Sequence, residues 1–251
     1  MKKYATTAAA IGLAVMLAPA AAGAVELKVM STNGVKSVLE ELAPQFEKAT
    51  GHKLTIRFAP AADLKGQIEK GEAFDLAILT AAALDDLIKQ GKLAAATRAN
   101  IANSGAGVAI KKGAPRPDIA TADAFKRTLL NAKSIAYVGT GATGANMRKI
   151  FAQLGIAEEM KAKTKLLSGI SAADAVASGD AELGFTQISE ILPVAGAELA
   201  GPLPPGIQIL TAFPAAVGTG AKEPVAAKSL LDFLRTPAAA ALIKAKGMEP
   251  G

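Results

Sequence analysis

Residues 27–34, LKVMSTNG, decide the fold class of this chain, because they join a short apolar strand to a polar turn and then to a helix. After this stretch, apolar residues recur at helical spacing. They are Val35, Val38, Leu39, Leu42 and Phe46. Gly51 stands where a C-terminal cap is expected, and Pro44 should kink this helix or start a second one.

The same alternation of strand and helix continues to the end of the chain. Further strands are predicted over residues 53–58, 74–79, 134–138, 165–167 and 183–185. Further helices are predicted over residues 61–68, 84–89, 145–154, 171–177 and 224–246. This order indicates an α/β fold with a mostly parallel sheet that helices cover on both faces.

Two extended segments that contain glycine, Ser104–Ile110 and Ala215–Gly220, lie far apart in the sequence and enclose a second set of strands and helices. We therefore expect two Rossmann-like lobes. Residues 25–105 and 215–251 would form the first lobe, and residues 106–214 would form the second. The two segments would act as a two-part hinge, with a ligand cleft between the lobes.

Residues 1–24 have the features of a secretory signal peptide. Lys2 and Lys3 precede a short apolar core, Pro19 interrupts it, and small residues allow cleavage after Ala24. The alternative is a membrane anchor, but a core of about ten residues is shorter than the roughly 20 that cross a bilayer. We expect a periplasmic protein, in a compartment without a ready supply of ATP or reduced nicotinamide.

Composition excludes several kinds of chemistry. The chain has no cysteine and one histidine, His52, which leaves no thiolate metal site and no Ser-His triad. His52 follows a predicted helix end, where we expect it in solvent, and neither a metal cluster nor a cofactor is expected. Without Lys2 and Lys3, 26 of the 28 basic residues remain against 22 acidic ones, a net charge of +4 that favours an anionic ligand. The lysines are scattered without interleaved aromatics, so nucleic acid is not expected as a partner.

Residues 139–144, GTGATG, match the glycine pattern of dinucleotide sites and open a helix. That pattern also needs an acidic residue about 20 positions later, and residues 163–168, KTKLLS, contain none. The glycines and the free amides of a helix start suit a bound anion instead. The candidates here are Thr143, Gly144, Asn146 and Arg148. Arg148 could equally form a salt bridge or face solvent.

Polar or small residues also follow the other predicted strands, at the sheet edge where open α/β folds bind ligands. These candidates are Ser31, Thr32, Asn33, Gly34, Ala62, Asp63, Thr80 and Gln187. For residues 31–33 the alternative is simple helix capping. For Gln187, whose amide could meet a ligand oxygen, the alternative is solvation.

Several segments resemble the periplasmic substrate-binding proteins of ABC importers, in the branch that includes molybdate and sulfate binders. They are LAPQFEKATG at 42–51, QIEKGE at 67–72, FDL at 74–76, LGI at 154–156, GDAELG at 179–184 and LDFLRTP at 231–237. The resemblance implies a type II binding-protein fold and a monomer that closes over a small anion and delivers it to a membrane permease. It also implies that hydroxyls and amides, rather than charged side chains, hold the oxyanion.

The chain departs from the molybdate binders at two positions. Ser31 falls near one of their serine positions. The loop after the second strand usually offers another serine, but here it is Ala59-Pro60-Ala61-Ala62. The tyrosine often expected in the second lobe is replaced near Thr186 and Gln187.

The chain also resembles aconitate isomerase, an exported enzyme on the same scaffold. This resemblance implies a di- or tricarboxylate ligand, with which Lys36, Arg57 or Arg148 could pair. Two hypotheses follow. The first is a receptor without enzymatic activity; the second is a cofactor-free isomerase in which Lys36 and Asp63 serve as acid or base.

Overall fold

The computed structural model describes residues 23–251. The predicted signal peptide lies outside the described residues, apart from its last two positions, Gly23 and Ala24. In the described part, no helix is both long enough and apolar enough to cross a membrane.

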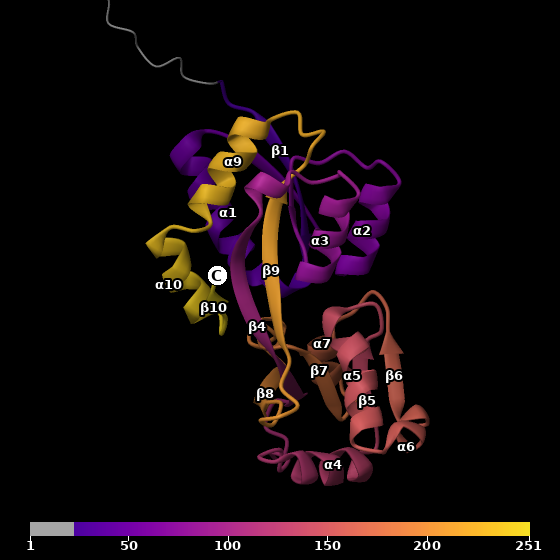
Figure 1. The fold of residues 1–251 in the computed structure, drawn as a ribbon. Helices are drawn as coiled ribbons and strands as arrows, with labels where there is room; N and C mark the ends of the chain where they lie inside the picture. The colour runs from indigo at the N-terminus through magenta and orange to yellow at the C-terminus, as the bar shows by residue number, and fades with distance from the viewer. Residues whose placement is uncertain (1–22) are drawn as a thin grey trace, which may run out of the picture.

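The first lobe is built on an open sheet (Figure 1). Its strands are β1 (Glu26–Thr32), β2 (Lys53–Ala59), β3 (Leu76–Ile78) and β9 (Leu210–Val217). β1 pairs in parallel with both β2 and β3, and β9 extends the sheet antiparallel to β3. Parallel pairing places the carboxyl ends of β1, β2 and β3 at one edge of the sheet.

Helices cover both faces of this sheet, as the sequence predicts. One face packs against α1 (Lys36–Thr50), α9 (Pro224–Phe233) and α10 (Pro237–Ala245). The other packs against α2 (Ala61–Glu69) and α3 (Ala81–Lys89). Because successive strand residues point to opposite faces, Leu27 and Val29 of β1 join the first core and Met30 joins the second.

The second lobe repeats this architecture. Its strands are β5 (Ile135–Val138), β6 (Thr164–Leu167), β7 (Leu183–Gln187) and β8 (Ala197–Pro202). β5 is parallel to β6 and β7. One core includes α4 (Ala122–Asn131), α5 (Ala142–Gln153) and α6 (Ala157–Lys161). A smaller core includes α7 (Ala172–Ser178) and α8 (Ile188–Ile191).

The strand β4 (Ala99–Lys111) belongs to both lobes. Its residues 99–105 pair with β9, and residues 106–111 pair with β7 and β8. β4 and β9 therefore run side by side between the lobes (Figure 1). The strand order is β2-β1-β3-β9-β4-β7-β5-β6, and β10 (Glu249–Pro250) also pairs with β4. The two-lobed α/β fold is confirmed, whereas the lobe limits given above stay a prediction.

Several element boundaries differ from the sequence prediction. α1 continues through Pro44 as one helix, and Pro44 is exposed, where the carbonyl that it leaves unbonded can reach water. The predicted C-terminal helix is two helices, because Thr236 caps a new helix that begins at Pro237. The prediction lacks α4, α6, α8, β8, β10 and two 3-10 turns, η1 (Asn33–Val35) and η2 (Ala95–Thr97).

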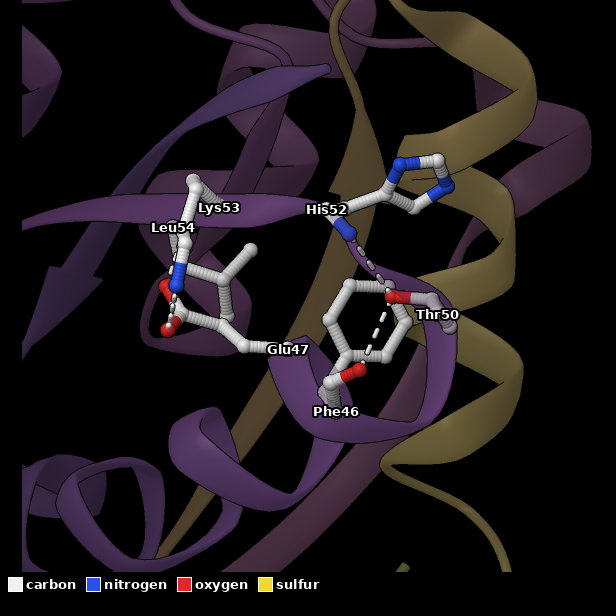
Figure 2. Close-up of polar contacts among 6 residues, drawn as sticks. All are labelled: Phe46, Glu47, Thr50, His52, Lys53 and Leu54. Carbon is white, nitrogen blue, oxygen red and sulfur yellow. Dashed lines mark hydrogen bonds and ion pairs between the residues drawn. The ribbon is translucent and has the colours of Figure 1, made fainter. Parts of the chain in front are cut away.

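His52 is buried, which corrects the expectation that it lies in solvent. α1 ends at Gly51, whose φ of 77° suits glycine, and the chain then turns His52 inward to 9% exposure. Its ring centroid lies 6.0 Å from that of Phe46, and its Nδ1 accepts the N–H of Val25 at 3.4 Å. Figure 2 shows the Thr50 hydroxyl donating to the Phe46 carbonyl at 2.8 Å and accepting the N–H of His52 at 3.3 Å.

Candidate functional site

A small cavity of about 40 Å³ lies between the two lobes. The first lobe contributes Thr32, Asn33, Pro60, Ala61 and Phe213. The second lobe contributes Val138, Gly141, Ala142, Thr143, Phe185, Thr186, Gln187 and Glu190. Most of these residues lie at the ends of strands and the starts of the helices that follow.

Two long helices begin at the cavity. α2 begins there with Pro60 and Ala61, and α5 begins there with residues 141–143. At neither start does a capping side chain accept a hydrogen bond from the first N–H groups. These N–H groups are therefore available to a ligand, and the helix macrodipole adds a preference for an anion.

Two glycines shape the cavity walls by allowing close approach. A Cβ at Gly144 would clash with the carbonyl oxygen of Val138, which is backbone and cannot move aside alone. A Cβ at Gly34 would overlap the ring of Phe213. Neither glycine lines the cavity itself. Gly144 lets α5 pack against Val138, and Gly34 lets η1 pack against Phe213.

Gln187 is the central polar side chain of the second-lobe wall, and it is 3% exposed. Its Nε2 donates to Oγ1 of Thr143 at 3.0 Å and to Oγ1 of Thr211 at 3.2 Å. Its Oε1 has no hydrogen-bond partner among the described residues. Because a buried acceptor without a donor destabilises the folded state, Oε1 favours a bound group that can donate a hydrogen bond.

Glu190 is the titratable side chain of the cavity wall. Its carboxylate accepts hydrogen bonds from the Thr186 hydroxyl and from the backbone N–H of Gln187. Burial raises the pKa of Glu190, and these two hydrogen bonds oppose the rise. The residues that line the cavity include no lysine or arginine, so no side-chain cation is available there to neutralise an anion. Among residues 23–251, no cluster of side chains is suited to hold a metal ion.

Four of the ligand residues predicted from the sequence line the cavity together. They are Thr32, Asn33, Thr143 and Gln187. Ser31 is fully buried next to Thr32, and its hydroxyl donates to the Thr32 carbonyl at 3.2 Å. The fold therefore brings together candidates from β1, α5 and β7 that are far apart in the sequence.

The other first-lobe candidates do not line the cavity. Ala62 and Asp63 are exposed on α2, and Thr80 precedes α3 at a helix start away from the cavity. Lys36 forms an ion pair with Glu40 at 3.7 Å. Asp63 and Lys36, the acid and base candidates, are thus outside the cavity wall.

The two arginines considered for a carboxylate ligand also lie outside the cavity wall. Arg57 and Arg148 are exposed, and Arg148 donates to the Gly139 carbonyl at 3.4 Å. Asn146 turns its amide back to the Ala142 carbonyl, 3.0 Å away within α5.

The sequence analysis missed Glu190, Thr211 and Phe213. Glu190 stands three residues after Gln187 at the start of α8, and this spacing is typical of an acidic side chain that caps a helix start. That pattern could have drawn attention to Glu190. Thr211 and Phe213 lie on β9, and no local pattern connects them with Gln187.

Ser189 of α8 links the two lobes beside the cavity, and it is 2% exposed. Its hydroxyl donates to the Gly34 carbonyl at 2.7 Å, and its own carbonyl accepts the Ser37 hydroxyl at 3.4 Å. Its Oγ also lies 3.4 Å from the Oγ of Ser104 on β4. These contacts hold the lobes together beside the cavity.

The sequence matches the family described as bacterial extracellular solute-binding protein over residues 27–249. The chain is 33% identical to an aconitate isomerase of Pseudomonas sp. over 229 aligned positions, which cover 89% of this chain and 87% of that protein. It is 31% identical to the molybdate-binding protein ModA of Azotobacter vinelandii over 256 aligned positions, which cover 94% of this chain and 95% of that protein.

The fold is similar to a solved structure, the periplasmic molybdate-binding protein of Azotobacter vinelandii. The TM-score is 0.77 at 22% identity, and the match covers 90% of this chain and 99% of that one. At this identity the similarity concerns the fold, which is that of a two-lobed periplasmic binding protein. From the match over residues 27–249, this chain belongs to the family of bacterial extracellular solute-binding proteins.

Proposed function

We propose that this protein is a periplasmic receptor that captures a compact oxyanion of the molybdate type and delivers it to an ABC importer. The observation that best supports this proposal is the small cavity between the lobes at the starts of α2 and α5. Its wall offers helix N–H groups, the Thr32 and Thr143 hydroxyls and the Asn33 amide, and no side-chain cation. Groups of this kind bind an anion through hydrogen bonds and the helix dipole.

The volume of the cavity supports a compact ligand. About 40 Å³ is room for only a few water molecules. A tetrahedral oxyanion is a small solute that only accepts hydrogen bonds when it is fully ionised. A tricarboxylate is larger, and we expect it to need cationic side chains, which the wall of this cavity lacks.

The two connecting strands support a receptor that opens and closes. A ligand that touches both walls would favour the closed state over the open one. β4 and β9 connect the lobes, and bending of these strands would part them. The closed form would then be the state that the membrane permease recognises.

A ligand screen with molybdate, tungstate, sulfate, citrate and trans-aconitate tests this proposal. A ligand at 100 times its Kd should raise the free energy of unfolding by about 2.7 kcal/mol, which a thermal shift detects. We expect stabilisation by molybdate or tungstate and little by the carboxylates, with calorimetry giving the Kd values. If none of the three oxyanions stabilises the protein, the proposal is wrong.

A second candidate function is the isomerisation of an unsaturated carboxylate. Two observations favour it: the 33% identity to the Pseudomonas enzyme, and the Glu190 carboxyl, whose raised pKa suits an acid or base. Because Lys36 and Asp63 do not line the cavity, Glu190 would take the role that the sequence analysis gave them.

Incubation with cis- or trans-aconitate separates the two functions. A receptor leaves each isomer unchanged, whereas an isomerase converts either into the same mixture, which proton NMR follows over time. If the protein is an isomerase, Glu190→Gln should slow the conversion by roughly 10²–10⁴-fold, while Asp63→Asn should not. A conversion that both variants retain would leave Glu190 without this role.

A further inference from the structure

Glu190 is an unusual residue for the wall of an anion site. Among the described residues that line the cavity, it is the one that titrates. If Glu190 were ionised, its negative charge would face a negative ligand with no cation nearby on the wall. Two like charges at close range in a water-poor site repel each other strongly.

The surroundings of Glu190 offer no compensating charge. It lies on α8, which packs against α1, η1, β4, β7 and β8. The charged residues of these elements are Lys36, Glu40, Glu41, Glu47 and Lys48 of α1, Lys111 of β4 and Glu198 of β8. Five of them form ion pairs away from Glu190: Lys36 and Glu40 with each other at 3.7 Å, Glu41 with Lys246 at 2.8 Å, Glu47 with Lys53 at 3.1 Å and Glu198 with Arg116 at 2.5 Å. None of these charges contributes to the pKa of Glu190, which burial raises.

A second acceptor lies beside Glu190. The Oε1 of Gln187 is buried and has no donor among the described residues, while its Nε2 is occupied by Thr143 and Thr211. The cavity wall therefore includes two groups that accept hydrogen bonds, and a fully ionised oxyanion can donate to neither. A proton placed on one of the carboxyl oxygens, or on a ligand oxygen that faces it, turns the repulsion into a hydrogen bond.

We propose that the site binds its anion together with one proton, which is shared between the Glu190 carboxyl and an oxygen of the ligand. The proton comes from a hydronium ion or a buffer acid in the solvent: its bond to that donor breaks as one O–H bond to Glu190 or to the ligand forms, and water or the buffer base is released. Glu190 thereby makes affinity depend on pH and limits the charge that the closed cavity accepts. This inference rests on the proposed binding of a compact oxyanion.

Calorimetry with molybdate, and with sulfate as a ligand that does not itself titrate near neutral pH, tests the inference. In the native protein, affinity should be constant at low pH and fall roughly tenfold per pH unit above the pKa of Glu190, up to about pH 9. Titrations in two buffers of different ionisation enthalpy count the protons, and the uptake should approach one per anion at the upper end of this range. Glu190→Gln should bind with little pH dependence and no proton uptake. Glu159→Gln, an exposed site on α6, is the matched control and should behave like the native protein.

These measurements distinguish failure of the proton-uptake inference from failure of the proposed oxyanion binding. If an oxyanion binds the native protein with an uptake below about half a proton at pH 9, the inference is overturned and the proposed function stands. If Glu190→Gln keeps the native pH dependence, the inference is also overturned. If no oxyanion binds at any pH, the proposed function fails and the inference fails with it. The proton count on the native protein decides the matter even if Glu190→Gln does not fold.

Discussion

The two walls of the cavity differ in the groups that they present. On the first-lobe wall, Thr32 and Asn33 are the polar side chains, Pro60 and Ala61 have no polar side-chain atoms, and the start of α2 offers its backbone N–H groups. The second-lobe wall is a network of polar side chains. Gln187 donates to Thr143, and Thr186 donates to Glu190.

This difference separates affinity from selectivity. Backbone N–H groups donate at every pH and to any anion of suitable size. Side chains such as Gln187 and Glu190 also accept hydrogen bonds, and Glu190 changes charge with pH. We therefore expect both walls to contribute to affinity and the second-lobe wall to set which anion binds, and in which protonation state.

The largest effect is expected where the second-lobe wall loses its backbone geometry. Gly144→Ala would push the start of α5 away from the Val138 carbonyl. We expect a loss of about 1–3 kcal/mol in the free energy of unfolding and a larger loss of oxyanion affinity, because overpacked sites relax through backbone shifts. Chemical denaturation and calorimetry measure the two quantities.

Gly66→Ala is the matched control on the first-lobe side. Gly66 lies within α2, and a Cβ there would meet nothing within 4 Å. This variant should gain about 0.5–1 kcal/mol of stability and keep its affinity, because alanine favours a helix interior over glycine. Equal behaviour of the two variants would contradict the close packing of α5 on β5.

The second-largest effect on oxyanion affinity is expected from the hydrogen bonds of Gln187 in the second-lobe wall. Gln187→Leu removes the amide that bonds Thr143 and Thr211. We expect oxyanion affinity to fall by about 1–3 kcal/mol, since buried hydroxyls lose their partner next to the ligand. Arg148→Ala, at an exposed position outside the cavity wall, is the control and should change affinity by less than about 0.5 kcal/mol. The reverse order of effects would show that the ligand binds at Arg148 instead.

A smaller effect is expected where the two walls meet. Ser189→Ala removes the hydroxyl that donates to the Gly34 carbonyl at 2.7 Å across the lobes. The closed state should lose about 0.5–1.5 kcal/mol, which weakens ligand binding by a similar amount. Ser178→Ala is the control, because the Ser178 hydroxyl donates only within the second lobe, to Ala175 and Asp180. Calorimetry should find its affinity unchanged, and equal losses in both variants would argue against a link between lobes.

The smallest effects are expected in the pH dependence of stability, where Glu190 can be compared with Glu47. Burial raises the pKa of Glu190, so its stabilising contribution is complete in acid and is lost as the pH rises through its folded-state pKa. Hydrogen bonds from the N–H of Leu54 and then from the Lys53 side chain lower the pKa of partly exposed Glu47. The contribution of Glu47 is therefore present at neutral pH and is lost as the pH falls through its folded-state pKa.

Melting temperatures between about pH 4 and pH 8 check these opposite signs. Relative to the native protein, Glu190→Gln should gain stability as the pH rises, and Glu47→Gln should lose it. If both differences change in the same direction, burial is not what distinguishes the two carboxyls.

Much of the fold could be predicted from local patterns. The apolar spacing in residues 27–51 predicts β1 and α1, and both form. α4 and β8 could not be predicted in the same way. The stretch that becomes β8, Ala197–Pro202, has no clear alternation and is held by its pairing with β4, which is distant in sequence.

The candidate site was predictable only where a strand end and a helix start are adjacent in the sequence. This local signal identifies Thr32, Asn33 and Thr143, which line the cavity. The same signal at Thr80 does not lead to the cavity. The prediction that His52 lies in solvent was wrong for a related reason. Its burial depends on the way the chain turns back on Phe46 after Gly51.

The sequence by itself determined most of the strand and helix order, the two crossing segments and the presence of polar residues at strand ends, because apolar periodicity, glycine and proline act over a few residues. Only the tertiary structure decided which strand ends meet. It placed the starts of α2 and α5 on one cavity, and it placed half-buried Glu190 in the wall of that cavity. These contacts depend on strand order and on closure of the lobes, which bring together residues that no local pattern connects.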